Sequence, residues 1–548
     1  MKDVVLQNQD IATYQSSLPK RQVITAMAGT MLSMFLGSIF MTITATAMPR
    51  IVTDLGGFSQ YTWVFTSYII TETIAVPLTG KLSDMFGRKW FFVVGMSIFV
   101  LGSFFCGISQ SMSQLIIYRA FQGIGFGIMS ALGFIVIADI FAPEERGKYG
   151  GLMAGVFGLS TIIGPTLGGY LTDALSWRWC FFVPIPIGVI IIILFIFMFP
   201  QLHAGTRKYR IDYAGAVAMT LFITPLILAL NWAGVDYAWS SPIILGLFGF
   251  SAVMFVLFIF IEKRAEEPII PLSLFRNRVV VVSAIVGFLM GASFFPVVTF
   301  VPLYFQGVMG TSATQSGGLL TPMMLSASLG SFICGQFLSR AGGHYRLQGG
   351  IGFAITVVGF FLLSRMSTET SYATAIFNII LVGFGSGLIM PVHTIAVQNT
   401  VPYSIMGTAT SMIQLLRPLG GVFGLAVVGS VLNNHFASEF IGNLSAGVKA
   451  VLSPEKLTAI VDNPQALVNP EARLQLQGMF EGAGAQGAEL FEQMMSTLQN
   501  ALNSALTQVF FVFLIASILA LLVNCFLKGI PPHRKKEDVS AAKSKKSL

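Results

Sequence analysis

Long apolar stretches alternate with short polar segments along most of this chain. A helix needs about 20 mostly apolar residues to cross the hydrocarbon layer of a membrane, and stretches of that length recur between residues 27 and 527. The alternating ten-residue strands typical of a membrane β-barrel are absent from the sequence, so the pattern predicts helices. We predict fourteen spans, at residues 27–48, 61–79, 90–108, 114–140, 149–171, 181–199, 213–232, 242–261, 279–303, 317–338, 349–364, 373–396, 406–432 and 507–527.

The composition agrees with an integral membrane protein and not with a soluble fold. Hydrophobic residues make up 54% of the chain, charged residues only 10%, and the mean hydropathy is +0.76, which is far more apolar than a soluble core requires. The five His and four Cys residues show no metal-ligand spacing. No nucleophile with a nearby base is visible, and the glycines of "GIGFG" at 123–127 lie inside a span, where they favour close helix packing. The sequence therefore predicts neither an enzyme nor a cofactor or metal site.

The basic residues predict the orientation in the membrane. If the N-terminus is cytoplasmic, most of the 32 Lys and Arg residues fall in cytoplasmic segments, as the positive-inside rule expects. Both chain ends are then cytoplasmic, and the protein is a multi-pass protein of the cell membrane. The same asymmetry accounts for the net charge of +8 without a nucleic-acid partner. The basic tail, 528–548, either lies against anionic membrane lipids or is solvated.

Two pairs of similar segments indicate two related halves. "GKLSDMFGRK" at 80–89 aligns without gaps with "GQFLSRAGGH" at 335–344, and "GPTLGG" at 164–169 is similar to "RPLGG" at 417–421. Repeats of this kind are typical of transporters in which two bundles move around a site near the middle of the membrane.

Taken together, these residues resemble the major facilitator superfamily, and within it the fourteen-span drug:proton antiporters. The family's loop motif, G-x-L-[AS]-D-[RK]-x-G-[RK]-[RK], departs here only at Met85 among its specified positions. The matching residues are Gly80, Leu82, Ser83, Asp84, Gly87, Arg88 and Lys89.

The resemblance implies an all-α major facilitator fold of two six-helix bundles plus two extra transmembrane helices, complete as a monomer. The expected parts are a cytoplasmic N-terminal segment at 1–26, an N-terminal bundle at 27–199, a linker with the two extra helices at 200–275, a C-terminal bundle at 276–527 that includes an outer loop at 433–506, and the tail at 528–548.

The same resemblance implies a cytoplasmic gate. Asp84, Arg88 and Asp139 would form a charge cluster that holds one conformation and breaks in the other. Gly80 and Gly87 would let the loop turn tightly where two helix ends approach each other. The alternative is a positively charged turn with no gating role.

The fifth predicted span matches the family's antiporter signature, G-x-x-x-G-P-x-x-G-G. Gly164, Pro165, Gly168 and Gly169 fit the signature, whereas Ser160 replaces its leading glycine. Because proline removes a backbone donor and glycine permits close approach, the resemblance implies a kinked helix at the interface between the bundles. A packing kink without a mechanistic role is the alternative.

Glu72 is the only one of the 24 acidic residues in the interior of a predicted span, since Asp139 is the last residue but one of the span at 114–140. A charge at the centre of a membrane helix costs about 2.5 to 3.5 kcal/mol on insertion scales, so such residues are usually functional, and Glu72 is a candidate proton site. Tyr68 lies one helical turn away and could hydrogen-bond it. Arg119, which with Gln122 matches the family's R-x-x-Q-G-x-G pattern, is the nearest cation, and we predict an exchangeable Glu72–Arg119 pair. A permanent ion pair that only orients helices is the alternative.

The first span departs from the family at the usual site of proton binding. Many relatives carry L-D-x-T-I-V there, whereas this chain reads "IFMTITATAMP", which puts Phe40 in the place of the acid when Pro49 is aligned. We therefore expect Glu72 to have taken over proton coupling one helix away.

A pocket of adaptable methionine and aromatic side chains would suit broad hydrophobic specificity. Arg417, inside the thirteenth span, either caps backbone carbonyls near Pro418 or helps to bind substrate or reset the proton cycle. The candidate cavity residues are Met34, Phe40, Tyr68, Gln122, Phe294, Phe295, Tyr304, Gln306 and Arg417.

The segment between the last two spans, 433–506, is the longest polar stretch outside the predicted spans. Ser453-Pro454 and Asn469-Pro470 are typical of helix starts, with a capping residue followed by proline. We expect short amphipathic helices on the outer surface, acting as a lid or docking site or forming a solvated linker.

The resemblance implies a secondary transporter that exports amphipathic cationic or zwitterionic compounds in exchange for protons, by alternating access. Its partners would be a small-molecule substrate, protons and membrane lipids. Two alternatives stay open: a proton-coupled carrier of a specific metabolite, siderophore or lipid, and a membrane receptor or scaffold that uses the outer loop.

Overall fold

The computed structural model describes residues 19–55, 60, 63–141, 143–200, 211–234, 237–311, 313–341, 344–453, 457, 460, 470–480 and 487–528. The predictions for 1–18 and 529–548 lie outside these residues. In the described part the chain is helical, and its only β pairing is an isolated bridge between Ala233 and Tyr237. The longer helices of the first part are α2 (Lys20–Leu55), α3 (Trp63–Phe86), α4 (Arg88–Gly107), α5 (Met112–Ile140), α6 (Pro143–Ala174), α7 (Trp177–Phe182) and α8 (Pro184–Met198).

The remaining helices follow in the same manner. They are α9 (Tyr213–Trp232), α10 (Pro242–Arg264), α11 (Arg278–Gly307), α12 (Ala313–Ala341), α13 (Tyr345–Leu363), α14 (Tyr372–Gln398), α15 (Met406–Asn443), α16 (Ala446–Val451), α18 (Pro470–Phe480) and α19 (Gly487–Asn524). Each of the fourteen predicted ranges coincides with a helix, although the span predicted at 181–199 is divided between α7 and α8. Pro184 occupies the first turn of α8, where its missing N–H costs nothing.

Eleven candidate spans in the described residues are long and apolar enough to cross a membrane. The other three predicted spans, α3, α6 and α12, are helices of 24, 32 and 29 residues but carry more polar side chains. Their polarity has a structural reason, because these three helices face the opposite half of the protein rather than lipid alone. Their membrane crossing is therefore part of the proposal made below.

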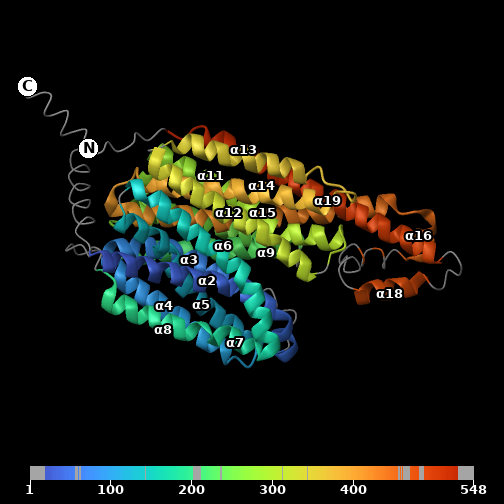
Figure 1. Ribbon diagram of the computed structural model, residues 1–548, viewed down its shortest axis with the longest axis horizontal. Helices are drawn as coiled ribbons and strands as arrows, with labels where there is room; N and C mark the ends of the chain where they lie inside the picture. The colour runs from blue at the N-terminus through green and yellow to red at the C-terminus, as the bar shows by residue number, and fades with distance from the viewer. Residues whose placement is uncertain are drawn as a thin grey trace, which may run out of the picture.

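The helices form two groups that lie side by side (Figure 1). Helices α2 to α8 share one large apolar cluster, and helices α11 to α19 are joined by two others. The most extensive contacts between the groups run along two seams, α6 with α12 and α3 with α15. We refer to these groups as the N-terminal and C-terminal halves.

The two extra helices lie against one side of this interface. Helix α9 packs on α10 and also contacts α3 and α15. Its buried residues Met219, Ile223 and Ile227 share an apolar cluster with Ile70 of α3 and Ile413 of α15. Helix α9 therefore covers the edge of the α3–α15 seam.

The segment 433–506, where we expect short amphipathic helices, is largely helical in its described parts, but extensions of the two flanking helices supply much of it. Helix α15 continues to Asn443 and α19 begins at Gly487. The apolar faces of these extensions bury Phe436, Phe440 and Phe491 in the same cluster as the C-terminal half, so the helices have a reason to continue beyond the hydrocarbon. Together with α16 and α18 they project at one end of the molecule (Figure 1).

Helix α18 begins at Pro470, as the Asn469-Pro470 pattern predicts. It buries Leu476 and Phe480, one turn apart, which gives it the predicted amphipathic character. The second predicted start, at Pro454, lies outside the described residues.

Candidate functional site

A cavity of about 320 Å³ lies between the two halves. Its size fits the range of small-molecule sites, roughly 300 to 1,000 Å³. Its wall is dominated by flexible methionine and by phenylalanine side chains, contributed by both halves. These residues are Met34, Met41, Met153, Met290, Met324, Met390, Phe126, Phe134, Phe294 and Phe295.

Two charged side chains stand out on this apolar wall. Glu72 of α3 and Arg417 of α15 are the only charged residues among the described lining residues. They belong to opposite halves of the protein. A ligand in the cavity would therefore meet one acidic and one basic side chain within a mainly apolar surface.

Four of the predicted cavity residues lie on this wall, namely Met34, Phe294, Phe295 and Arg417. The other five do not appear among its described lining residues. Gln122 is fully buried and holds Arg119, as described below. Gln306 is half-buried near the end of α11.

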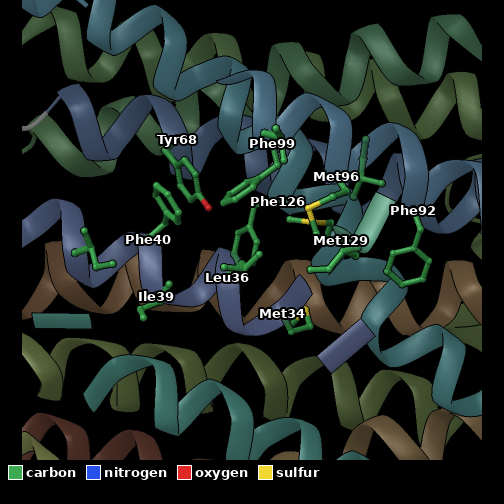
Figure 2. Packing of buried hydrophobic residues seen from close by; sticks show 14 of the residues in the cluster. Met34, Leu36, Ile39, Phe40, Tyr68, Phe92, Met96, Phe99, Phe126 and Met129 are labelled. Carbon is green, nitrogen blue, oxygen red and sulfur yellow. The ribbon is translucent and has the colours of Figure 1, made fainter. Parts of the chain in front are cut away.

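Phe40 and Tyr304 belong to apolar packing instead of the cavity wall. Phe40 is fully buried, in edge contact with Phe99 at 5.2 Å between ring centroids, and Figure 2 shows it within the core of the N-terminal half. The Tyr304 hydroxyl donates to the carbonyl of Ser367 at 3.0 Å. Helical spacing identifies which residues share a face of a helix, but not which neighbour that face meets.

The predicted partnership of Glu72 with Arg119 takes a different form in the structure. The two charges interact through space, but the ion pairs that the structure describes do not include this pair. The fully buried Arg119 instead donates to Gln122 Oε1 at 2.8 Å and to the Val64 carbonyl at 3.4 Å. Its Nη2 has no hydrogen-bond partner. Arg119 is thus held in place without being neutralised by a carboxylate contact.

Tyr68 contacts Arg119 through its ring and not Glu72 through its hydroxyl. The Arg119 guanidinium lies 4.2 Å from the ring centroid, a cation–π contact. The ring also stacks on Phe126 with 5.9 Å between centroids, and Figure 2 shows these aromatic groups beside each other. The buried Tyr68 hydroxyl has no hydrogen-bond partner, so the expected hydrogen bond to Glu72 is not formed.

Another buried acid, Glu262, lies just beyond the span predicted at 242–261. Glu262 lies near the end of α10, where its two carboxylate oxygens accept from the backbone N–H groups of Ile269 and Ile270, each at 3.3 Å. Glu72, by contrast, lies in the middle of α3 on the cavity wall. Glu262 therefore stabilises a turn by accepting backbone hydrogen bonds, whereas Glu72 faces a cavity.

Arg417 contacts a carbonyl outside its own helix and also lines the cavity. Its Nη2 donates to the Met390 carbonyl at 2.7 Å and to Thr394 Oγ1 at 3.1 Å, which caps a carbonyl, although on α14 and not beside Pro418. The side chain also lines the cavity, and its buried Nε has no hydrogen-bond partner.

The predicted charge cluster is present at the end of the helices that carries the loop motif. Arg88 forms ion pairs with both acids, contacting Asp84 through Nη2 and Asp139 through Nε, the latter at 2.9 Å. Its Nη1 donates to Ser83 Oγ at 2.7 Å. Gly87, which precedes α4, has φ of 90°, a backbone conformation that favours glycine.

The same cluster reaches across to the C-terminal half. Asp84 Oδ2 accepts from the Thr408 backbone N–H at 2.9 Å and from its hydroxyl at 3.1 Å. Thr408 lies in the first turn of α15, where N–H groups have no partner in the helix and a negative charge is favourable. Gly80 lies against Gly407 and Ser411 of α15. The charge cluster thus closes the α3–α15 seam.

The α6–α12 seam is closed at the same end by backbone contact. A Cβ atom on Gly147 would lie 2.6 Å from the Gly335 carbonyl oxygen, and one on Gly335 would overlap the Gly147 carbonyl. Arg146 adds hydrogen bonds to α14 and the residue after it, to the Gln398 carbonyl at 3.4 Å and to Asn399 Oδ1 at 2.7 Å.

The antiporter signature lies where α6 meets α2 of its own half. Gly164 approaches Thr42 and Ile39, and Gly168 approaches Thr46 and Ile43. Gly169 has no atom within 4 Å of the position of a Cβ. Pro165 falls in the middle of α6. The residue pairs brought together here are within one half, whereas the resemblance implies an interface between bundles.

Several polar groups on the cavity wall are absent from the residues predicted to line it. Asn231, from the extra helix α9, lines the cavity, as do Gln414 of α15 and Ser130 of α5. The Gln414 Nε2 atom is buried without a hydrogen-bond partner. The available signal was an amide inside or at the end of an apolar run, as in "LALNWAG" and "SMIQLLRP".

Comparison with known proteins agrees with this architecture. Residues 30–425 match the family model described as Major Facilitator Superfamily. A protein of Bacillus subtilis (strain 168) named multidrug transporter protein MdtP is 36% identical over 529 residues, which cover 95% of each chain. Multidrug resistance protein 3 of the same organism is also 36% identical, over 91% of this chain and 94% of its own.

Solved structures show the same fold at low sequence identity. The human organic anion transporter MFSD10 has a TM-score of 0.57 at 13% identity, covering 91% of this chain and 100% of its own. The proton:xylose symporter XylE has a TM-score of 0.55 at 14% identity, over 92% and 95% of the two chains. The helical architecture, the match over residues 30–425 and the two bacterial relatives show that this chain belongs to the major facilitator superfamily of membrane transporters.

Proposed function

We propose that this protein exports amphipathic cationic or zwitterionic compounds, multiple drugs among them, across the cell membrane in exchange for protons. The observation that carries this proposal is the position of Glu72, the only described acid on the wall of an otherwise apolar cavity between the two halves. The names of the two Bacillus relatives support multiple drugs as the cargo class.

In this proposal Glu72 binds the exchanged proton. The membrane interior penalises a charged carboxylate, and Glu72 has no ion-pair partner among the described contacts, so a proton or a cationic substrate can each remove that penalty. Because both cannot do so at once, binding of one favours release of the other. Arg119, on the neighbouring helix, is held by Gln122 and Tyr68 and forms no described ion pair with Glu72.

The proposed topology has fourteen spans with both chain ends in the cytoplasm. The three polar helices α3, α6 and α12 supply the spans beyond the eleven apolar candidates. The expected parts at 27–199 and 276–527 would be the moving bundles, with 200–275 joining them as a monomer. The distribution of the Lys and Arg residues supports this orientation.

The proposed topology assigns the structure to an outward-facing conformation. The described hydrogen bonds between the two halves involve Asp84, Phe134 and Arg146 on one side and Gln398, Asn399 and Thr408 on the other. All of these lie toward the proposed cytoplasmic end. Opening toward the cytoplasm would therefore require the Asp84–Thr408 contact to break, which makes the charge cluster a gate.

The test is proton release from proteoliposomes with an acidic interior, which contain only this protein, on addition of a panel of cationic drugs. Wild type should release protons and Glu72→Gln should not, while thermal unfolding shows that the variant is folded. Glu262→Gln is the matched control, because it changes another buried acid that does not line the cavity.

Equal release by wild type and Glu72→Gln would move proton coupling to another group. Absence of release from either protein, for every compound in the panel, would reject drug:proton exchange and favour a carrier of a specific metabolite, siderophore or lipid. Drug-independent binding of a partner protein to the outer helices would favour the receptor alternative.

A further inference from the structure

The buried cation Arg417 has no negatively charged partner in the described structure. Its side chain is 7% exposed, and arginine stays protonated in proteins. None of the described ion pairs includes it, and no acidic side chain contributes to its electrostatic surroundings. Buried charges are normally paired or coordinated because an isolated charge is costly to desolvate. An anionic group of a ligand would therefore supply the negative charge that Arg417 lacks.

The orientation of Arg417 is fixed by neutral acceptors. Nη2 donates to the Met390 carbonyl and to Thr394 Oγ1, at 2.7 and 3.1 Å. These contacts hold the guanidinium against α14 but do not neutralise it. They leave Nε buried and without a partner, on a side chain that lines the cavity.

A second donor without a partner lies on the same face of α15. Gln414 is three residues before Arg417, which places the two side chains on one face of the helix. Both line the cavity, and Gln414 Nε2 is also buried without an acceptor. A carboxylate, which has two acceptor oxygens, fits such a pair of donors, and hydrogen bonds to a charged acceptor are stronger than neutral ones.

The opposite wall of the cavity indicates which other chemical groups a ligand carries. Glu72, on α3, is the remaining charged lining residue, and methionine and phenylalanine supply most of the large apolar side chains on the rest of the wall. A molecule with a cationic group, an apolar aromatic body and a carboxylate would meet all three kinds of surface.

We propose that Arg417 and Gln414 form a carboxylate-binding subsite, and that the preferred substrates are zwitterionic amphiphiles whose cationic group faces Glu72. This proposal rests on the proposed function, because it takes the cavity as the substrate site. It narrows the cargo from cationic or zwitterionic compounds to those that carry an anionic group.

The test uses two fluorescent dyes that differ only at the carboxyl group, rhodamine B, which is a zwitterion, and its ethyl ester, which is a cation. Their dissociation constants are measured by fluorescence anisotropy with purified protein in detergent, in a low-salt buffer that contains no carboxylate, so that buffer anions do not compete for the subsite. Arg417→Gln should raise the dissociation constant of rhodamine B about tenfold or more, the loss expected for a charge-assisted hydrogen bond, and change that of the ester less than about twofold.

Two further variants keep the test decisive if Arg417→Gln does not fold. Arg417→Lys retains the charge but not the planar set of donors, so it should weaken rhodamine B binding by a smaller factor. Gln414→Leu should weaken rhodamine B binding and not ester binding. Asn231→Leu is the matched control, because it removes another amide from the cavity wall and should affect the two dyes equally.

Equal effects of the Arg417 and Gln414 variants on the acid and the ester would overturn the inference, as would a wild type that binds neither dye. The outcome is separable from that of the proposed function, because equilibrium binding requires no proton gradient. Selectivity that depends on Arg417 without proton release would refute only the exchange mechanism. Proton exchange with no selectivity for the carboxylate would refute only the subsite.

Discussion

The α3–α15 seam and the α6–α12 seam occupy corresponding places in the sequence repeat, yet different interactions close them. Gly80 of α3 aligns with Gly335 of α12, and each lies where its helix meets the opposite half. In the first seam, Asp84 reaches the start of α15 and is itself held by Arg88. In the repeat, Ser339 stands in the place of Asp84.

This difference indicates that the two seams have different roles in opening and closing. Charge-assisted hydrogen bonds can be exchanged for water when the seam opens, so the α3–α15 seam can respond to changes in charge. The backbone contact between Gly147 and Gly335 involves no charged group and leaves no space for a Cβ atom. The α6–α12 seam therefore tolerates no added atoms at this point. The following predictions are ordered from the largest expected effect to the smallest.

The largest effect is expected from Gly335→Ala in the α6–α12 seam. The added methyl group would meet the Gly147 carbonyl, a backbone atom that cannot rotate away. Overpacking costs about 1 to 3 kcal/mol, which would disfavour the closed seam and lower drug transport by roughly tenfold or more in proteoliposomes. Gly155→Ala, on α6 with no atom within 4 Å of the new Cβ, is the matched control. Full activity of Gly335→Ala would show that this seam is not tightly closed during transport.

Asp84→Asn should have the next largest effect, through the charged seam. The amide oxygen can still accept from the Thr408 N–H, but the ion pair with Arg88 is lost. Hydrogen bonds to charged groups contribute about 1.5 to 3 kcal/mol, so the transport rate should fall about tenfold while the unfolding temperature changes little. Asp173→Asn, an exposed acid in the same half, is the control. A normal transport rate in Asp84→Asn would remove the gate hypothesis.

Arg146→Gln tests whether the contacts of α6 with the opposite half also depend on polar interactions. The substitution removes the donors to Gln398 and Asn399, and the two lost hydrogen bonds are together worth about 1 kcal/mol at the lower end of the net range. We expect an approximately fivefold slower transport rate, measured with the same dye or drug as above. Lys148→Gln, an exposed neighbour on α6, should behave as wild type. An effect as large as that of Asp84→Asn would contradict the proposed division between the seams.

Lys81→Met should have the smallest effect, although it breaks an ion pair of 2.7 Å with Glu267 of the linker. The two side chains are only 11% and 22% exposed, so the Coulomb gain of the ion pair is largely offset by desolvation and its net contribution is about 0 to 1 kcal/mol. Transport should change by about twofold or less, and 1 M salt should reduce the difference from wild type only in part, because partly buried pairs are screened less than exposed ones. Lys89→Met in the same loop is the control. A strong effect would mean that the linker holds the loop motif in place.

The sequence predicts the helices well because their signals are local. The apolar lengths locate all fourteen, and Asn469-Pro470 identifies the start of α18. The Asp84–Arg88–Asp139 cluster was also predictable, because the loop motif fixes two members within one turn and family resemblance supplies the third.

The contacts between helices could not be predicted in the same way. Glu72 and Arg119 lie on neighbouring helices, but whether they touch depends on the rotation of each helix about its axis, and here Tyr68 and Gln122 take the contacts of Arg119. Asn231 was missed because nothing local indicates that the extra helix α9 reaches the cavity. The extensions of α15 and α19 were missed because only one face of each is apolar, and the polar residues on the other face lower the average hydropathy of the segment.

Those extensions have a practical consequence for following transport. Helices α15 and α19 each contain 38 residues, which corresponds to about 57 Å at 1.5 Å per residue, against a hydrocarbon thickness of about 30 Å. The projecting ends are therefore rigid helical extensions of the C-terminal half. A small tilt of that half displaces their tips farther than any residue within the membrane, so a spectroscopic label placed there magnifies the motion it reports.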